Sequence, residues 1–315
     1  IQQLFFYSQT LDEINQVKAL EQESKRLQRQ FPTTMVMKEL PQPRQAYVLR
    51  RGQYDQPDKD QPVSAGIPAL FRSDQRPKNR LELARWLVDG QNPLTARVAV
   101  NHWWNRYFGI GLLETPENFG VQSPAPSHPF LLDWLATELV RTGWDVKAMQ
   151  RLIVTSATYR QSSEATPESF NKDPENRYLA RGPRFRLPAE SVRDNALFVS
   201  GLLKQRVGGP SIKPYQPTGL WEELAGGAGE PPYKQAQGED LYRRSLYIYR
   251  KRTVPHPTMT TFDGGGRDVC AVSRDRTNTP LQALALLNDA TYVEAARAMA
   301  AEAIEADSNL VERLK

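Results

Sequence analysis

A series of helix start signals between residues 79 and 203 is the feature that most constrains the fold of this chain. Asn79, Ser127 and Asp145 each stand just before an amphipathic run, where a side-chain oxygen can accept hydrogen bonds from the first unpaired amides of a helix. Pro188 opens a further run, and its fixed φ suits the first turn of a helix. The pattern predicts a helical body over this part of the chain.

The spacing of apolar residues gives the expected bounds of these helices. They are 81–88, 130–140, 146–158 and 189–203, followed by 280–287 and 291–306. Tryptophans at five positions in the helical body predict a large aromatic core, because tryptophan buries more apolar surface than any other side chain. They are Trp86, Trp103, Trp104, Trp134 and Trp144.

Three β-prone runs interrupt the helical pattern. Thr34–Leu40 and Gln45–Arg51 flank a Pro-Gln-Pro-Arg segment, which indicates a hairpin with a four-residue turn. Arg244–Arg252 alternates in the manner of a strand and is expected to add a third antiparallel strand. The predicted fold class is therefore mainly α with a small antiparallel β-sheet (α+β).

The pattern divides the chain into a short helical part and one large domain. From Leu11 to Leu27 apolar residues recur at spacings of three, four and seven, so residues 1–32 are predicted to be a helical connector or the end of an upstream domain. Residues 33–315 are predicted to form the main domain. It contains a Gly- and Pro-rich loop at 204–240, either a functional loop or a disordered insert.

Composition excludes several classes of function. The 41 Lys and Arg exceed the 36 Asp and Glu by a net charge of only +5, too small an excess to favour nucleic-acid binding. No apolar run approaches the roughly 20 residues of a membrane span. The single cysteine, Cys270, is followed by Ala271 and excludes both a Cys-rich metal site and the C-x-x-C-H attachment of haem c, so no cofactor is predicted in this chain.

Few residues suggest catalysis, and no motif predicts a metal site. Of the three histidines, His256 lies between two prolines on a loop and is a candidate, whereas His102 and His128 are interpreted as structural. Glu190 and Asp194 share one helix face with Arg193. Such a carboxylate pair could cleave glycosidic bonds, or it could be a structural ion-pair network.

Further candidates are scattered over the second half of the chain. Asp263 is a further candidate for a catalytic carboxylate, and it and Lys251 are candidates for a charged cleft. Trp221, Tyr215 and Tyr233 lie in or beside the long loop and could stack on sugar rings. Together with Arg193 and Lys251 they form the predicted binding set.

Several motifs occur in order along the chain and together resemble one known family. They are Met35-Val-Met-Lys-Glu-Leu40, Tyr47-Val-Leu-Arg-Arg-Gly-Gln-Tyr54, Asn79-Arg-Leu-Glu-Leu-Ala-Arg-Trp-Leu87, Ser127-His-Pro129 with Leu132-Asp-Trp-Leu135, Ile153-Val-Thr-Ser-Ala-Thr-Tyr-Arg-Gln-Ser162, Asp173-Pro-Glu-Asn-Arg177 and Thr277-Asn-Thr-Pro-Leu-Gln-Ala-Leu284. The chain resembles the planctomycete cytochrome-associated family known as domain of unknown function fifteen fifty-three. Where similar proteins carry a proline and a second acid after Phe-Asp, this chain has Gly264-Gly265-Gly266, a departure from the family pattern.

The resemblance implies an exported, multidomain parent protein, located in the periplasm, at the cell surface or outside the cell. Its partners would be an upstream haem c module and a companion domain of the same protein. The start without Met and the end inside a helical pattern agree with a piece of a longer product.

Three functions follow as hypotheses. The first is a scaffold or redox-partner module of a c-type cytochrome-like protein. The second is an extracellular enzyme acting on polysaccharide. The third is a surface protein that self-assembles through residues 1–30.

Overall fold

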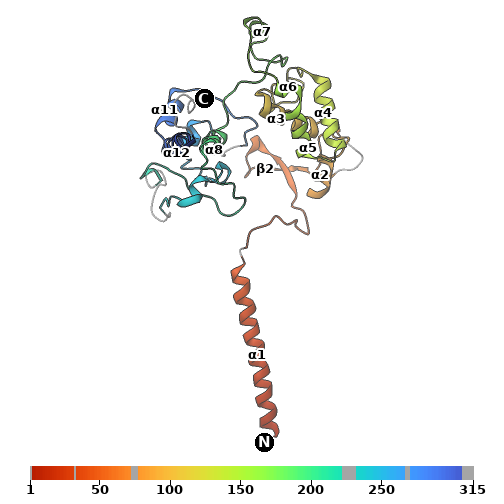
Figure 1. Cartoon of the computed structure of the whole chain (residues 1–315). Helices are drawn as coiled ribbons and strands as arrows, with labels where there is room; N and C mark the ends of the chain where they lie inside the picture. Colours follow the sequence, from red (N-terminus) through yellow and green to blue (C-terminus); the bar gives the residue numbers. More distant parts are fainter. Residues whose placement is uncertain (1, 32, 72–76, 222–231, 267–269, 307–315) are drawn as a thin grey trace. The chain divides into compact units, whose positions relative to one another are not determined.

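The computed structural model describes the chain outside residues 1, 32, 72–76, 222–231, 267–269 and 307–315, and for residues 2–10 it describes the backbone alone (Figure 1). The chain forms two compact units, residues 1–80 and 81–315, and each is described by itself. The mainly helical fold with a small antiparallel sheet is confirmed. Within the described residues, no helix combines the length and the apolar character that a membrane crossing requires.

The first unit contains one long helix and a two-stranded sheet. Its elements are α1 Gln2–Gln30, β1 Ala46–Leu49, η1 Arg50–Gly52, β2 Pro57–Val63 and η2 Ala69–Phe71. The amphipathic run predicted from Leu11 to Leu27 lies within α1, and its apolar side chains are exposed.

The strand pairing in the first unit differs from the predicted hairpin, which was wrong. β1 pairs antiparallel with β2, with Ala46 opposite Val63, whereas residues 34–40 form no strand. Residues 34–40, the predicted partner strand, bury no apolar face, and Met35 in this segment is 99% exposed. Without a buried face, nothing fixes the register in which this segment would pair. Two prolines are tolerated in β2 because both strands of a two-stranded sheet are edges.

The second unit has two hydrophobic clusters, and the first lies in a stretch of consecutive helices. They are α2 Arg80–Leu87, α3 Thr95–Phe108, α4 Pro129–Arg141, α5 Val146–Thr155, α6 Ala157–Arg160 and α7 Pro167–Lys172. The core of this cluster comes from α3, α4 and α5, including the fully buried Val100 and Leu139.

The five tryptophans differ in their relation to this core, and Trp86 on α2, contrary to the prediction, is not part of it. Trp104 is buried and stacks on Phe108 with ring centroids 4.1 Å apart. Trp103 and Trp144 pack against the cluster from its edge. Trp134 is 52% exposed, contrary to the prediction, because α4 turns the face with Leu135 and Leu139 to the core instead.

Helix capping explains where α5 begins and ends. The Asp145 carboxylate accepts a hydrogen bond from the Ala148 amide at 2.9 Å, as the sequence predicts. The run predicted to continue to residue 158 breaks at Ser156, whose backbone is extended with ψ 149°. The Ser156 hydroxyl then accepts from the Tyr159 amide at 3.2 Å, so this residue ends one helix and caps the next.

The second cluster is built from the later elements. They are α8 Ala189–Val199, η3 Gly238–Tyr242, η4 Ser245–Tyr247, α10 Pro257–Thr261, α11 Pro280–Asn288 and α12 Ala290–Ala306. The predicted third strand at 244–252 was wrong, because Ser245–Tyr247 is a single 3₁₀ turn. Ile248 instead makes an isolated parallel bridge with Ile212 and is buried in the cluster.

Buried arginines order the described parts of the long loop, residues 204–221 and 232–240. The Arg243 guanidinium donates to the carbonyls of Pro210 at 2.9 Å and of Gly208, and it lies 3.9 Å from the centre of the Tyr247 ring. Arg193 donates to the carbonyls of Arg243 at 2.9 Å and Leu241 at 2.6 Å. These backbone carbonyls thus accept hydrogen bonds from guanidinium groups, whereas in a sheet they would accept them from the amides of a neighbouring strand.

Candidate functional site

Helix α3 presents two different faces. Ala96, Val100, Trp104 and Phe108 recur every four residues and are buried in the first cluster. His102, Asn105, Arg106 and Gly109 follow the spacing three, four and seven of another face, and they line a pocket. His102, interpreted from sequence as a core residue, is therefore a pocket residue.

The pocket has a volume of about 410 Å³, within the range of sites that hold small ligands. Its walls are the last turns of α3, the segment that follows, and three stretches of the second cluster, all within the second unit. Beyond α3 the lining residues are Ile110, Glu114, Pro116, Glu117, Arg186, Pro188, Phe262, Asp263, Val272, Ser273, Arg274, Asp275 and Arg276.

A buried asparagine fixes the segment after α3. The Asn101 side chain, 0% exposed, donates to the Leu113 carbonyl at 2.9 Å and accepts from the Leu113 amide at 2.9 Å. Gly111 passes so close to the Leu113 carbonyl and the Asn101 amide group that a β-carbon at position 111 would clash with both. This pocket wall is therefore held in one conformation.

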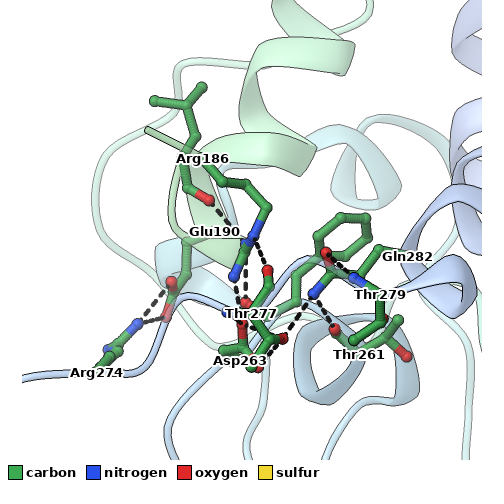
Figure 2. Close-up of polar contacts among 10 residues, drawn as sticks. Arg186, Glu190, Thr261, Asp263, Arg274, Thr277, Thr279 and Gln282 are labelled. Carbon is green, nitrogen blue, oxygen red and sulfur yellow. Dashed lines mark hydrogen bonds and ion pairs between the residues drawn. The ribbon is translucent and has the colours of Figure 1, made fainter. Parts of the chain in front are cut away.

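Asp263 also lines the pocket, and Figure 2 shows the polar contacts around it. Its carboxylate accepts hydrogen bonds from the Thr277 amide at 2.8 Å and hydroxyl at 2.9 Å, and it forms an ion pair with Arg186. Arg186 also donates to the Thr277 carbonyl at 3.0 Å, and Gln282 donates to the Thr277 hydroxyl at 3.1 Å. The network links the segments around residues 186, 263 and 277. The Asp263 carboxylate is therefore occupied by hydrogen bonds and an ion pair within the protein.

The surroundings of Asp263 lower its pKa. Partial burial raises the pKa of this carboxyl, but the hydrogen bonds from Thr277 and the charge of Arg186 outweigh burial, and the net pKa lies below its usual value. The residue also has φ 58°, a left-handed conformation that aspartate and asparagine tolerate better than most side chains.

Asp263→Asn is expected to lower the free energy of unfolding by about 1–2 kcal/mol at pH 7, since it removes the charge-assisted bonds without straining the backbone. A lowered pKa gives stability that is present above the unfolded-state pKa near 3.9 and lost as pH falls through the folded-state pKa. The difference between wild type and variant should therefore shrink as pH falls from about 4 through the folded-state pKa. Urea unfolding between pH 2.5 and 7 measures it.

The control is Asp133→Asn, which removes a more exposed ion pair with Arg97 and should cost under about 1 kcal/mol. A deficit of Asp263→Asn that stayed constant down to pH 2.5 would contradict the assigned role of the charge.

Glu190 and Asp194 are each engaged by an arginine. One Arg274 nitrogen donates to both Glu190 oxygens, at 2.9 and 3.0 Å (Figure 2). Asp194 accepts from the Ser245 amide at 2.7 Å and lies 3.6 Å from Arg244. Glu190 does not line the pocket with Asp263.

The pKa of Glu190 also differs from that of a general acid. Partial burial raises it, but a backbone hydrogen bond and the charges of Arg274 and Arg250 outweigh burial, so the net pKa is lowered. A proton donor at neutral pH needs a raised pKa. This geometry therefore suits a structural ion pair.

The predicted aromatic residues lie in a separate cluster. Trp221 is 5% exposed, with its ring centroid 5.4 Å from that of Tyr233. Lys213 and Lys251 lie 5.0 and 4.6 Å from the centre of the Trp221 ring. The protein's own side chains thus cover this tryptophan.

His256 and Tyr215 meet away from the pocket. The buried imidazole donates from Nε2 to the Tyr215 carbonyl at 2.8 Å, which leaves Nδ1 unprotonated in the neutral form. Burial lowers the pKa of His256 and outweighs the opposing hydrogen bond to Tyr215. His256 is therefore neutral at pH 7.

Arg106 and Arg276, which sequence reasoning did not single out, also line the pocket. Arg276 donates to the Gly109 carbonyl at 3.1 Å and lies 4.3 Å from the centre of the Phe185 ring. Burial, followed by the charges of Arg106 and Arg186, lowers its pKa. Neither Arg106 nor Arg276 forms an ion pair with any described carboxylate, although Glu114, Glu117, Asp263 and Asp275 also line the pocket.

The described residues contain no group of three or more His, Cys, Asp or Glu arranged to hold a metal ion.

No curated protein and no solved structure matches the chain. A protein-family model matches residues 79–315, and the match begins beside the division between the two compact units after Arg80. Because this match covers most of the chain, the chain belongs to the family described as PSD1, Protein of unknown function (DUF1553).

Proposed function

We propose that this chain is a ligand-binding scaffold module of an exported multidomain protein, and that the pocket beside α3 takes a small anionic ligand. The observation that carries the proposal is the pair of guanidinium groups, Arg106 and Arg276, that border one pocket without carboxylate partners among the described residues. Like charges in proximity destabilise each other, and an anion between them relieves the repulsion.

The state of the predicted catalytic carboxylates supports binding rather than catalysis. Glu190, Asp194 and Asp263 each accept from an arginine or a backbone amide that positions a neighbouring segment. The charge of Asp263 holds a pocket wall in place, and Glu190 pairs with Arg274, which lines the pocket. The alternative, an enzyme acting on polysaccharide, would need one of these groups to leave its partner and take up a proton.

D-galacturonate, a small carboxylate, is expected to bind saturably, whereas galactose, which lacks the carboxylate, should bind at least tenfold more weakly. Arg106→Gln should weaken galacturonate binding at least about tenfold, because a charge-assisted hydrogen bond contributes about 1.5–3 kcal/mol. Isothermal titration calorimetry at low ionic strength measures both effects.

The matched control is Arg151→Gln, an exposed arginine on α5 outside the pocket, which should bind as wild type does. Equal affinity of wild type and Arg106→Gln for galacturonate would refute the proposed site.

The proposed parent carries its redox chemistry in a c-type haem module outside this chain. The full-length parent, expressed in a host that attaches haem, should then show a haem absorption band. A purified full-length protein without that band would count against this part of the proposal.

Self-assembly through α1 is a second candidate, favoured by one observation. Leu11, Ile14 and Leu20 are exposed on this helix, with Leu20 at 70%. Light scattering of the chain tests it, and a monomeric mass at the highest soluble concentration would remove this candidate.

A further inference from the structure

A second pocket of about 380 Å³ adjoins the first. Gly109, Ile110 and Arg276 line both pockets. Because Arg276 spans from the Gly109 carbonyl to the Phe185 ring, its guanidinium forms part of the shared wall. A ligand longer than one pocket would pass this arginine.

The second pocket repeats the chemistry of the first and adds aromatic rings. Arg184 is exposed and forms no ion pair within the described ranges, whereas Arg181 is engaged by the carbonyls of Asp173 and Pro174 at 2.8 Å. Phe170 and Phe185 contribute apolar ring surface to the lining. Each pocket therefore offers a guanidinium, Arg106 in one and Arg184 in the other, with Arg276 between them.

Both pockets also contain carboxylates, which limit the kinds of anionic ligand that they can bind. Glu117 and Asp275 line the first pocket, Glu175 lines the second, and none of them forms an ion pair within the described part. Such acceptors would repel a densely charged polyanion. They would accept hydrogen bonds from hydroxyl groups, which a sugar ring supplies in number. The combination suits a chain of rings that each carry one acid group and several hydroxyls.

We propose that the two pockets form one groove for an acidic oligosaccharide, with successive carboxylates bound by Arg106, Arg276 and Arg184. The inference rests on the proposed function of the first pocket. It extends that function to a specific polymer class and to a second site. A single sugar acid fills the first pocket, and a longer chain crosses Arg276 into the second.

Calorimetry with galacturonate and its linear trimer tests the proposal on the wild-type chain and on Arg106→Gln, Arg184→Gln and the control Arg151→Gln. The trimer should bind at least tenfold more tightly than the monomer. Arg106→Gln should weaken both ligands about tenfold, whereas Arg184→Gln should weaken the trimer about tenfold and leave the monomer within twofold. The methyl-esterified trimer, which keeps the rings but loses the charges, should bind at least a hundredfold more weakly.

The outcomes separate the two proposals. If Arg184→Gln binds the trimer as wild type does while Arg106→Gln is impaired, the continuous groove is overturned and the first pocket stands. If Arg106→Gln leaves the monomer unaffected, the proposed function itself fails. A sulfated trisaccharide or a tri-aspartate peptide that binds more tightly than the galacturonate trimer would overturn the assignment to a carboxylated sugar.

Discussion

Arg193→Met is expected to lower the free energy of unfolding by about 3–5 kcal/mol, the range seen when a buried charged partner is removed from its network. Arg193 is only 2% exposed, and burial lowers its pKa despite the opposing charge of Asp194. Its guanidinium donates to the carbonyls of Arg243 and Leu241, which methionine cannot do. The buried carbonyl of Arg243 and the partly buried carbonyl of Leu241 would each lose a hydrogen-bond donor, and Asp194 would lose a nearby positive charge.

Denaturant unfolding followed by circular dichroism measures the loss, and Arg141→Met is the matched control. Arg141 pairs with Glu138 on the exposed surface of α4, where solvent screens the interaction, so its replacement should leave the stability close to that of wild type. Arg193→Lys should recover little, because one ammonium on a flexible stem does not reproduce a planar fork that spans several acceptors. If the free energy of unfolding of Arg193→Met lay within about 1 kcal/mol of the wild-type value, the hydrogen bonds of Arg193 would not be what holds residues 238–245 in place.

Local signals predicted most helices approximately, although Ser127 does not cap α4, whose N-cap is His128 without a side-chain hydrogen bond. The start of α5 follows from Asp145, which caps the helix through its own side chain. Strand pairing was predicted poorly. β1 pairs with the polar strand β2, and neither strand has a buried face that would specify the register. Pairing across a loop depends on turn geometry that residue composition does not determine.

In the candidate site too, the sequence shows the spacing of residues within one helix but not their partners from distant parts of the chain. The spacing of Glu190 and Asp194 on one helix is visible in the sequence, but the partner of Glu190 is Arg274, 84 residues away. The four-residue spacing of His102 and Arg106 was also visible. The structure shows that the face of α3 with Trp104 packs in the core, and that the face with His102 and Arg106 lines the pocket.

Asn101→Asp is expected to lower the free energy of unfolding by about 3–5 kcal/mol at pH 7, and to disturb the pocket wall at residues 110–113. The asparagine amide donates to the Leu113 carbonyl and accepts from the Leu113 amide, both at 2.9 Å, in a fully buried position. An aspartate would keep the acceptor but place a second oxygen against the carbonyl. Asn195→Asp, at an exposed position of α8, is the control and should cost under about 0.5 kcal/mol.

The pH dependence of Asn101→Asp identifies the cause of its destabilisation. Burial and the nearby Leu113 carbonyl would raise the pKa of the introduced carboxyl above its unfolded value near 3.9, because only the protonated form can donate to that carbonyl. The folded variant then binds its proton more tightly than the unfolded chain, so its stability falls as pH rises from about 4 to the folded-state pKa. The deficit relative to wild type should be smallest below pH 4 and largest at neutral pH, as measured by urea unfolding across that range. A deficit independent of pH would instead point to altered packing around position 101, and the hydrogen-bonded wall would not depend on the asparagine amide.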